Sequence, residues 1–284
     1  MGTKVMVNGL PGKMAMEVAA LIKSGLFSSD GYSEFDLVRY SLTSSNQTAG
    51  IAVGAYRDVE PIRPDQREEE IGRLKEVYEG RTILSVDYTT PEVVNGNADF
   101  YCRQGLPFVM GTTGGDRAAL EARVRDSDIV AVVAPNMAKQ IVALQAMFAY
   151  AANTFPGAFE GYTLEVEESH QAGKKDTSGT AKAMVAYFNT LGVPFAVEDI
   201  RRFRDPVVQE HLMGVPKEHL GGHGWHGYVL KSKHEDVELH FEHNVNGRRV
   251  YVEGTLDALK FLQRKVEAGE KGKVYSMIDV LRGE

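Results

Sequence analysis

Hydrophobic and polar residues alternate in two ways along the first half of the chain. Short apolar runs such as KVMVN have the length and composition of buried strands, whereas KMAMEVAALIKS carries apolar residues at the spacing of one helix face. The predicted strands are Lys4–Asn8, Phe35–Thr43, Thr82–Tyr88, Pro107–Met110 and Ile129–Ala134, and the predicted helices are Lys13–Ser24, Arg67–Glu79, Pro91–Arg103 and Asp116–Arg125. A polar stretch without predicted structure fills the gap from Ser44 to Gln66. Strands that alternate with helices at this spacing predict βαβ units and a parallel sheet.

The pattern changes near Asn136. A long apolar helix is predicted first, and later segments alternate apolar and polar residues with the period of half-buried strands. The predicted helices are Lys139–Asn153, Thr180–Leu191, Thr255–Glu267 and Val274–Leu281, and the predicted strands are Tyr162–Glu168, Tyr228–Ser232, Val237–His243 and Arg249–Glu253. We therefore expect an α/β first half followed by an α+β layer with an antiparallel or mixed sheet.

Composition narrows the class of protein. The 284 residues are 43% hydrophobic and 25% charged, which is typical of a globular chain with one large or two ordinary domains. One cysteine, Cys102, excludes an intramolecular disulfide and a cysteine-rich zinc site. The net charge of −7 argues against general nucleic-acid binding, and no apolar run reaches the ~18 residues of a membrane span.

A glycine turn follows the first predicted strand. Gly9-Leu10-Pro11-Gly12-Lys13-Met14 stands between a strand and a helix, where dinucleotide-binding proteins bring backbone N–H groups and a helix N-terminus to a pyrophosphate. The alternative is that the two glycines serve only the turn. The position, in the first βα unit of a series, favours nucleotide binding.

The end of the second strand bears on the choice of cofactor. NAD sites usually place Asp or Glu there to bind the ribose 2′-hydroxyl, whereas this strand ends in Leu42-Thr43-Ser44-Ser45. Hydroxyl groups can bind a 2′-phosphate, and Lys13 lies on the first helical turn nearby. This favours NADPH over NADH, although Thr43–Ser45 can also be read as an ordinary polar loop.

The carboxyl ends of parallel strands meet at one edge of a sheet, so the segments that follow them should converge on one crevice. The candidate cofactor-binding residues are Gly9, Leu10, Pro11, Gly12, Lys13, Met14, Thr43, Ser44, Tyr88, Thr89, Gly111, Thr112, Thr113, Ala134, Pro135, Asn136 and Met137.

The densest chemistry lies between Glu168 and Thr180. His170 and Lys174 are able to move protons, and Ser178 or Thr177 is expected to cap a helix whose first N–H groups, at Gly179 and Thr180, face outward as an anion site. The order of residues does not fit a phosphate-binding P-loop, which needs G-x-x-x-x-G-K-[ST]. The alternative is a solvated basic loop that caps a helix.

Three histidines lie close together in HLGGHGWHG. His219, His223 and His226 suggest zinc, but the glycines and predicted turns do not fix the geometry of a ligand set, and no acid or cysteine completes one. We therefore expect no metal.

Together these motifs resemble those of the 4-hydroxy-tetrahydrodipicolinate reductases, also called dihydrodipicolinate reductases. The resemblance covers essentially the whole chain. It is carried by Gly9–Met14, by Asp87-Tyr88-Thr89 with Pro91, by Gly111–Gly114, by the Glu168–Thr180 block and by Tyr275–Leu281. The form SHQAGK, with Gln171 where the common bacterial form has a second histidine, is similar to the plant-type branch.

The resemblance implies a Rossmann-type doubly wound sheet in residues 1–136, a substrate and oligomerisation domain in 137–253, and C-terminal helices in 254–284 that return to the first domain. It also implies hydride transfer from NADPH, with NADH possible, to a small cyclic dicarboxylate in lysine and diaminopimelate biosynthesis. The protein would be a homo-oligomer, a tetramer as in the family or a dimer. It would be located in the cytoplasm, or in the plastid stroma for a mature plant-type chain, and would not act on a membrane.

The resemblance also assigns roles to residues. His170 falls on the catalytic acid/base position and Lys174 on the proton-donor position. Gly179 and Thr180 fall on the substrate-carboxylate site, and Thr113 lies where cofactor and substrate meet. Ser178 opens the carboxylate site, and Gln171 can hydrogen-bond a substrate carboxylate but cannot match its charge.

Two other hypotheses stay open at this point. Another two-domain NAD(P)-dependent dehydrogenase of amino or dicarboxylic acids would share the first half, but the His170–Thr180 block argues against it. A non-catalytic NADPH sensor would lack the proton-transfer residues, and the presence of His170 and Lys174 argues against that.

Overall fold

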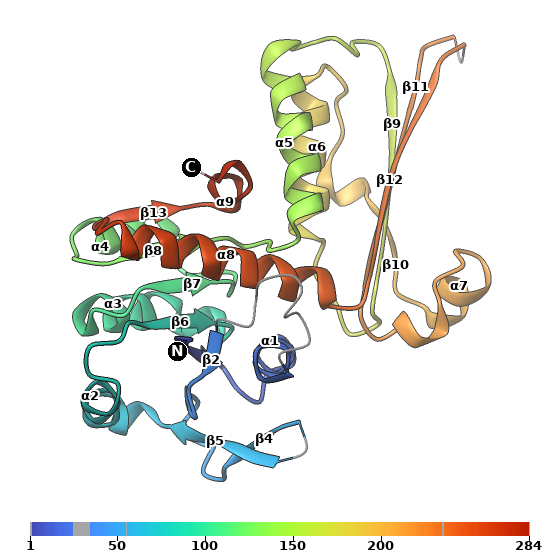
Figure 1. Ribbon diagram of the computed structural model, residues 1–284. Helices are drawn as coiled ribbons and strands as arrows, with labels where there is room; N and C mark the ends of the chain where they lie inside the picture. Colours follow the sequence, from blue (N-terminus) through green and yellow to red (C-terminus); the bar gives the residue numbers. More distant parts are fainter. Residues whose placement is uncertain (1, 25–34, 55, 235, 284) are drawn as a thin grey trace. The chain divides into compact units, whose positions relative to one another are not determined.

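The computed structural model describes residues 2–24, 35–54, 56–234 and 236–283 (Figure 1). The chain divides into two compact units. Unit 1 comprises Met1–Lys139 and Tyr251–Glu284, and unit 2 comprises Gln140–Val250. Unit 1 is therefore built from two stretches that are far apart in the sequence, with unit 2 inserted between them.

Unit 1 contains a six-stranded sheet in which every pair of neighbours is parallel. Its strands, in spatial order, are β13 (Lys273–Tyr275), β8 (Val130–Val133), β7 (Phe108–Met110), β6 (Ile83–Asp87), β1 (Thr3–Asn8) and β2 (Phe35–Leu37). The chain runs from β1 outward to β2 and then continues on the other side at β6. The doubly wound parallel sheet that the sequence predicts is confirmed, and its switch point lies between β1 and β6.

The helices of unit 1 cover both faces of this sheet. They are α1 (Lys13–Ser24), α2 (Arg67–Val77), α3 (Val94–Gln104), α4 (Arg117–Arg125), α8 (Arg249–Glu267) and α9 (Met277–Arg282), with short 3₁₀ turns at Pro64–Gln66 and Pro91–Val93. Met6, Phe108 and Ala131 point to one face and pack with α3 residues such as Tyr101. Alternate residues such as Val109 point to the opposite face and are buried as well. Burial on both faces explains the continuous apolar runs of these strands.

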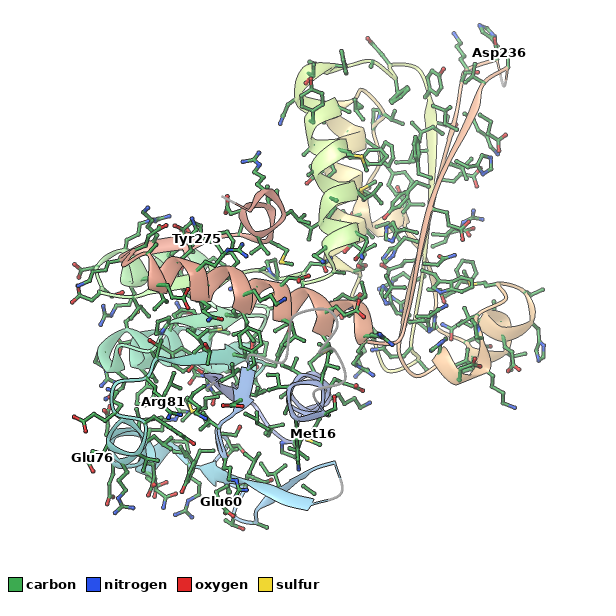
Figure 2. All side chains as sticks on the ribbon, viewed as in Figure 1. Met16, Glu60, Glu76, Arg81, Asp236 and Tyr275 are labelled. Carbon is green, nitrogen blue, oxygen red and sulfur yellow. The ribbon has the colours of Figure 1, made fainter. Side chains whose placement is uncertain are left out.

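Helix α8 packs unusually close to the backbone that follows β8. A Cβ on Gly254 would lie 1.7 Å from the Met137 carbonyl oxygen, so only glycine fits there. Further along α8, Phe261 packs edge-on against Tyr275 of β13, labelled in Figure 2, with ring centroids 5.0 Å apart.

Unit 2 has a mixed four-stranded sheet covered on one face by two helices. The spatial order is β10 (Arg201–Phe203), β9 (Thr163–His170), β11 (His223–Lys231) and β12 (Glu238–Asn246); β10 and β9 are parallel and the other pairs antiparallel. The unit's helices are α5 (Lys139–Thr154, which begins in unit 1), α6 (Gly179–Thr190) and α7 (Pro206–His211), with 3₁₀ turns at Val197–Asp199 and Lys217–His219. Val166, Tyr228 and Leu230 pack against Met184 and Phe188 of α6.

Five expectations about local structure are wrong. Arg249–Glu253 is the start of α8 and not a strand, because Val252 continues the buried face formed by Leu256 and Leu259. Val274–Leu281 is not one helix: β13 pairs with β8, and Ser276 then starts α9 with a capping box to Asp279.

The other three concern strands. Phe35–Thr43 forms two short strands, β2 and β3 (Tyr40–Leu42). The stretch expected to lack structure contains β4 (Ile51–Val53) and β5 (Tyr56–Ile62), which join β3 in a separate sheet of order β3-β5-β4. In unit 2, the segment expected to form turns around His223 and His226 is instead the first half of β11.

Within the described residues, none of the helices is both long enough and apolar enough to cross a lipid bilayer.

Candidate active site

The glycine turn of unit 1 is held tightly to the neighbouring strand ends. Gly9 has a φ of +97°, its N–H donates to the Leu42 carbonyl at 3.0 Å, and a Cβ there would lie 2.2 Å from the Tyr88 carbonyl oxygen. A Cβ on Gly12 would lie 2.7 Å from the Gly9 carbonyl oxygen. Both glycines are therefore required by contacts within the chain itself. The position of the turn at the switch point therefore indicates a dinucleotide site more strongly than the glycines do.

The start of α1 fits an anionic group. Lys13 and Met14 are its first residues, so their backbone N–H groups have no carbonyl partner within the helix and can bind an anion. The Lys13 side chain is exposed. The Gly9–Leu42 hydrogen bond brings the end of β3 beside this turn. There Thr43 is buried and Ser44 is exposed, so Ser44 and Lys13 are the groups that a ligand phosphate can reach.

The buried carboxylate of Asp87 organises the ends of β6 and β7. It is fully buried and accepts five hydrogen bonds, from Thr89 N–H (3.0 Å), Thr89 Oγ1 (2.7 Å), Thr112 Oγ1 (2.7 Å), Asn97 Nδ2 (2.9 Å) and Tyr101 OH (2.8 Å). Burial and the nearby Asp87 charge raise the pKa of Tyr101 well above its ordinary value, so Tyr101 remains a donor. The side chains of Thr89 and Thr112, expected to bind the cofactor, are thus engaged with Asp87, while Thr113 is exposed.

The side chain of Tyr88 is held by contacts within unit 1. A Cβ on Gly111 would lie 2.4 Å from its ring, and its hydroxyl donates to Thr255 Oγ1 of α8 at 2.6 Å, while Thr255 in turn donates to the Tyr251 carbonyl. Burial raises the pKa of Tyr88 to about 12. Its side chain therefore ties β6 to α8.

The last candidate segment follows β8. The Ala134 N–H donates to the Met110 carbonyl at 3.1 Å, which places this segment beside the end of β7. Pro135 is exposed, Asn136 accepts a hydrogen bond from the Ala138 N–H at 2.9 Å, and Met137 is buried. The structure thus brings the ends of β1, β6, β7 and β8 together at one edge of the sheet.

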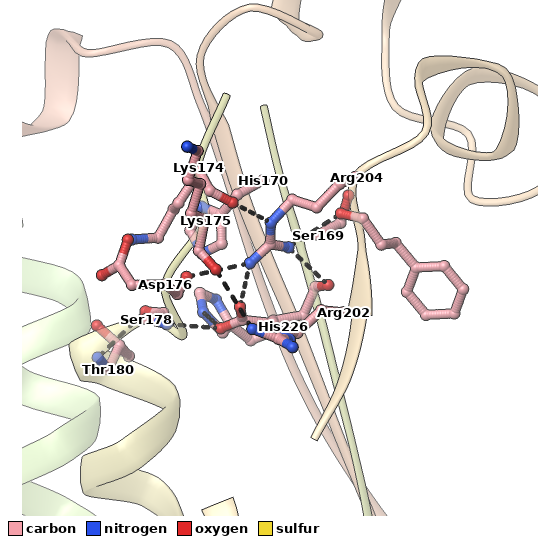
Figure 3. Close-up of polar contacts among 12 residues, drawn as sticks. Ser169, His170, Lys174, Lys175, Asp176, Ser178, Thr180, Arg202, Arg204 and His226 are labelled. Carbon is pink, nitrogen blue, oxygen red and sulfur yellow. Dashed lines mark hydrogen bonds and ion pairs between the residues drawn. The ribbon is translucent and has the colours of Figure 1, made fainter. Parts of the chain in front are cut away.

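The second cluster lies in unit 2, at the end of β9 (Figure 3). Residues Glu168 and His170 share the face of β9 that the helices cover, and Ser169 points to the opposite face. The chain then turns at Gln171, whose carbonyl accepts the Lys174 N–H at 2.9 Å, and reaches the start of α6 at Ser178.

His170 is fixed in one tautomer. Its Nδ1 lies 3.0 Å from the His223 carbonyl oxygen, which can only accept, so Nδ1 carries the proton and Nε2 has the lone pair. Burial lowers the pKa of His170 to about 4, the Glu168 charge opposes this, and the Arg204 and Lys174 charges add to it. The ring is therefore neutral near pH 7, with Nε2 available to accept.

Lys174 is partly covered and charge-paired. Its Nζ lies 3.0 Å from Asp176 Oδ1, and its side chain is 22% exposed. The pair with Lys174 lowers the pKa of Asp176. Since Asp176 is largely in solvent, another carboxylate can take its place on Lys174 at little cost.

Helix α6 begins at Ser178, one of the two expected caps. The Ser178 hydroxyl accepts the Thr180 N–H at 3.2 Å, so this N–H does not face outward as expected, whereas Gly179 is exposed. The Ser178 N–H itself donates to Glu168 Oε2 at 2.9 Å, and this bond joins the start of α6 to β9.

Arg204, which the sequence analysis gave no role, holds this loop in place. Its guanidinium forms an ion pair with Glu168 Oε1, donates to the Lys174 carbonyl at 2.8 Å and to the Phe203 carbonyl at 3.0 Å, and approaches the Asp176 carbonyl at 3.4 Å (Figure 3). Glu168 is fully buried and the Arg204 side chain is 18% exposed. The pair fixes the backbone on both sides of Lys174.

Gln209 is a second residue that sequence reasoning missed. It is fully buried in α7 and donates through Nε2 to the carbonyls of His170 (2.7 Å) and Phe203 (3.0 Å). Side chains alternate between the two faces of a strand, so Glu168 and His170 of β9 share a face. The sequence therefore contains a signal that Glu168 lies near the site. For Arg204 and Gln209 the sequence offers none, because both reach the site only through the folding of the chain after α6.

The three clustered histidines separate in the structure. His223 lies on the outer side, accepts from Ser169 Oγ at 2.8 Å, and donates through Nδ1 to the His219 carbonyl at 3.2 Å. His226 faces the helices, with Nε2 3.9 Å from Glu168 Oε2. Among the described residues, a different trio, Glu168, His170 and His226, brings potential ligand atoms within 4.8 Å of one another. Zinc holds its ligand atoms about 3.3 Å apart, so the trio would have to contract around a metal beside the cationic Arg204.

Comparison with known proteins identifies the family. A family model described as the N-terminus of dihydrodipicolinate reductase matches residues 3–137, and one described as its C-terminus matches residues 140–281. The chain belongs to the dihydrodipicolinate reductase family. It is 46% identical, over 98% of its length and 82% of the relative's, to a probable 4-hydroxy-tetrahydrodipicolinate reductase 2, chloroplastic, of Oryza sativa subsp. japonica. It is 43% identical, over 99% of its length and 78% of the relative's, to 4-hydroxy-tetrahydrodipicolinate reductase 2, chloroplastic, of Arabidopsis thaliana.

A solved structure supports the same fold. A dipicolinate-bound dihydrodipicolinate reductase from Paenisporosarcina sp. TG-14 superposes with a TM-score of 0.61 at 19% identity, covering 97% of this chain and 98% of that one. The resemblance to the reductase family stated from the motifs is thus confirmed.

Proposed function

We propose that this protein is a 4-hydroxy-tetrahydrodipicolinate reductase of lysine and diaminopimelate biosynthesis, which reduces a small cyclic dicarboxylate with a nicotinamide dinucleotide. The observation that carries the proposal is the match over nearly the whole chain to plant proteins named for this activity. The arrangement of His170, Lys174 and Ser178 supports it, because it combines a cation, a helix start and a neutral imidazole in one small region.

The dinucleotide belongs to unit 1, where it would supply the hydride. The start of α1 at Lys13 and Met14 would hold its pyrophosphate, and the exposed segment at Thr113 would lie near its reactive end. We further propose a preference for NADPH over NADH. No acid follows β3 to repel a 2′-phosphate, and Lys13 and Ser44 are both exposed beside the turn.

The substrate belongs to unit 2. Lys174 would bind one carboxylate in place of Asp176, and the start of α6, with Gly179, Thr180 and Ser178, would bind it or the second one. Gln171 would add a neutral hydrogen bond. Because Arg204 fixes the loop in advance, little ordering is left for the binding step.

The protonation states divide the work between two side chains. A neutral His170 has no proton on Nε2, so it serves as a hydrogen-bond acceptor or base for a substrate group. The Lys174 ammonium carries protons and is the group we assign to protonate the ring atom next to the reduced carbon.

A coupled assay tests the proposal. Substrate is generated from pyruvate and aspartate semialdehyde by a synthase, the protein is added with NADPH or NADH, and loss of reduced nicotinamide absorbance is followed. We expect consumption that depends on every component and is faster with NADPH. Binding of NADPH without consumption would favour another dehydrogenase or a sensor.

Two substitutions separate the roles within the site. We expect Lys174→Ala and His170→Ala to lower kcat by at least about 100-fold while NADPH binding is retained. Lys233→Ala, at an exposed lysine in the β11–β12 turn, is the matched control and should leave kcat unchanged. Equal activity of all three variants would remove the assigned roles.

We also propose that the protein is a homo-oligomer that associates through the face of the unit 2 sheet opposite its helices. That face carries Trp225 and Val229 between charged residues, and α5 and α6, which cover the other face, do not cover it (Figure 1). Light scattering after size-exclusion chromatography distinguishes monomer, dimer and tetramer.

A further inference from the structure

One cross-strand row in unit 2 breaks the pattern of its neighbours. On the face that the helices cover, successive rows across β9, β11 and β12 are Leu164–Leu230–Leu239, Val166–Tyr228–Phe241 and Glu168–His226–His243. The first two rows belong to the apolar core. The third lies at the same depth, with Glu168 fully buried and His226 5% exposed, yet all three of its residues are polar.

The imidazole of His226 stacks on that of His243, with centroids 4.6 Å apart, but it has no hydrogen-bond partner among the described residues. Both of its ring nitrogens are buried without a hydrogen bond, and so is Nε2 of His170. Burial lowers the pKa of His226 well below its ordinary value, so the ring is neutral and buries one N–H and one lone pair. Buried polar groups of this kind are nearly always satisfied in native proteins. A residue needed only for packing here would be apolar, as Leu230 is four residues along the same face.

The distances between these atoms indicate what kind of group hydrogen-bonds to them. The rings of His170 and His226 meet edge to face with centroids 5.1 Å apart, and Nε2 of His226 lies 3.9 Å from Glu168 Oε2. The facing ligand atoms of Glu168, His170 and His226 all lie within 4.8 Å of one another. These distances are too long for direct hydrogen bonds. One oxygen atom with hydrogen bonds of about 2.8 Å has the reach to span such distances.

The charges around the site favour a neutral ligand over a metal ion. Arg204 is paired with Glu168, and both Arg204 and Lys174 act on His170 and His226 as positive charges. A divalent cation would add to this positive charge and would require the trio to contract, whereas water requires neither.

We propose that Glu168, His170 and His226 form a binding site for one structural water molecule, and that His226 is thereby a positioning residue for His170. The Nε2–H of His226 donates to the water oxygen. The two water hydrogens then donate to Glu168 Oε2 and to Nε2 of His170. This arrangement gives a partner to Nε2 of both His226 and His170, and it also holds the His170 ring in place from the side opposite its bond to the His223 carbonyl.

Gly224 is part of the same arrangement. It pairs with His170 across the strands, and a Cβ there would lie 3.0 Å from Cε1 of the His170 ring. The absence of a side chain at this position lets the His170 ring lie this close to β11.

A high-resolution crystal structure of the unliganded protein is the direct test. We expect density for one atom about 2.6–3.2 Å from Glu168 Oε2, His170 Nε2 and His226 Nε2. Density at about 2.0–2.2 Å from all three would mean a metal, and a direct Glu168–His226 hydrogen bond with no density would mean an empty contact. Either result would overturn the proposal.

Nitrogen-15 NMR of the histidine rings gives a second readout that does not need turnover. We expect His226 to be protonated on Nε2. In His226→Leu, the Nε2 resonance of His170 should move toward the value of an unbonded ring nitrogen, and His226→Gln, which keeps an N–H donor, should move it back. Tyr228→Phe is the matched control, since it removes a buried unpartnered hydroxyl one row further along the same face and should leave the His170 resonance unchanged. An unmoved His170 resonance in His226→Leu would contradict the proposal.

The kinetic consequence rests on the proposed function. We expect His226→Leu to lower kcat about tenfold with little change in KM, as for the loss of one hydrogen bond that orients His170, and His226→Gln to recover most of it. A wild-type protein that does not turn over the substrate would refute the proposed function while leaving the crystallographic and NMR tests of the water site intact.

Discussion

Replacing Arg204 with methionine tests whether the loop that carries Lys174 depends on a buried ion pair. The substitution keeps most of the length of the side chain but leaves the Glu168 carboxylate, which is fully buried, without its positive partner. It also removes the donors that hold the Lys174 and Phe203 carbonyls.

The magnitude follows from burial. Removing one partner of a buried pair costs about 3–5 kcal/mol, because an unpaired charge remains in the interior. Arg204 is 18% exposed, so water reaches part of the gap and the low end, about 3 kcal/mol, applies. The two carbonyls add little, since they can turn to solvent. With a urea dependence of about 2 kcal/mol per molar, the unfolding midpoint should fall by about 1.5 M.

Two further variants make the experiment decisive. In Glu168→Gln/Arg204→Met no charge is left buried and the amide oxygen still accepts the Ser178 N–H, so more than half of the lost stability should return while kcat stays low. Arg201→Met removes an arginine that is 56% exposed and should cost less than about 0.5 kcal/mol. Equal midpoints for Arg204→Met and Arg201→Met would refute the reasoning.

Three other predictions concern separate features. His170 has a pKa of about 4 in the folded state against an ordinary value of 6.5, so the unfolded chain binds more protons than the folded chain between pH 4 and 6.5. The free energy of unfolding should therefore fall by up to about 3 kcal/mol as the pH drops from 6.5 to 4. Urea unfolding at each pH measures this, and the slope should be shallower in His170→Gln. Gly254→Ala puts a methyl group 1.7 Å from the Met137 carbonyl and should lower the midpoint strongly, whereas Gly72→Ala in α2, where nothing lies within 4 Å, should raise stability by about 0.5–1 kcal/mol. Ser178→Ala removes the cap of α6 and should cost about 1 kcal/mol and raise the substrate KM, while an unchanged KM would separate the cap from substrate binding.

The regular parts of the fold could be predicted because each local pattern has one interpretation. Lys13–Ser24 begins and ends as the spacing of its apolar residues indicates, and the strands of the parallel sheet are continuous apolar runs. The strand predicted at Arg249–Glu253 is wrong because so short a segment also fits the first turn of a helix. Only the later residues of α8 decide between a strand and a helix here. In Val274–Leu281 the Ser276–Asp279 capping box is the sequence signal for a helix that begins only at Met277.

The residues of the candidate site fall into two groups: those that the sequence indicates and those that only the fold brings to the site. His170, Lys174 and Ser178 lie within nine consecutive residues, so their spacing alone pointed to proton transfer and anion binding. The residues that position them come from elsewhere: Arg204 follows β10, Gln209 lies in α7 and His226 in β11. Their contacts depend on strand register, which a single sequence does not specify. Thr112 lies in the expected motif, and its side chain donates to Asp87.

The insertion of unit 2 into unit 1 has a consequence for biosynthesis. Unit 2 is continuous, so a ribosome delivers all of it before it delivers residues 251–284 of unit 1. Until then β8 lacks β13, its neighbour in the finished sheet, and most of α8 is also missing. An unpaired parallel strand is a template for pairing with other chains. The nascent protein is therefore most prone to aggregation late in translation, when one unit is complete and the other still waits for its last strand.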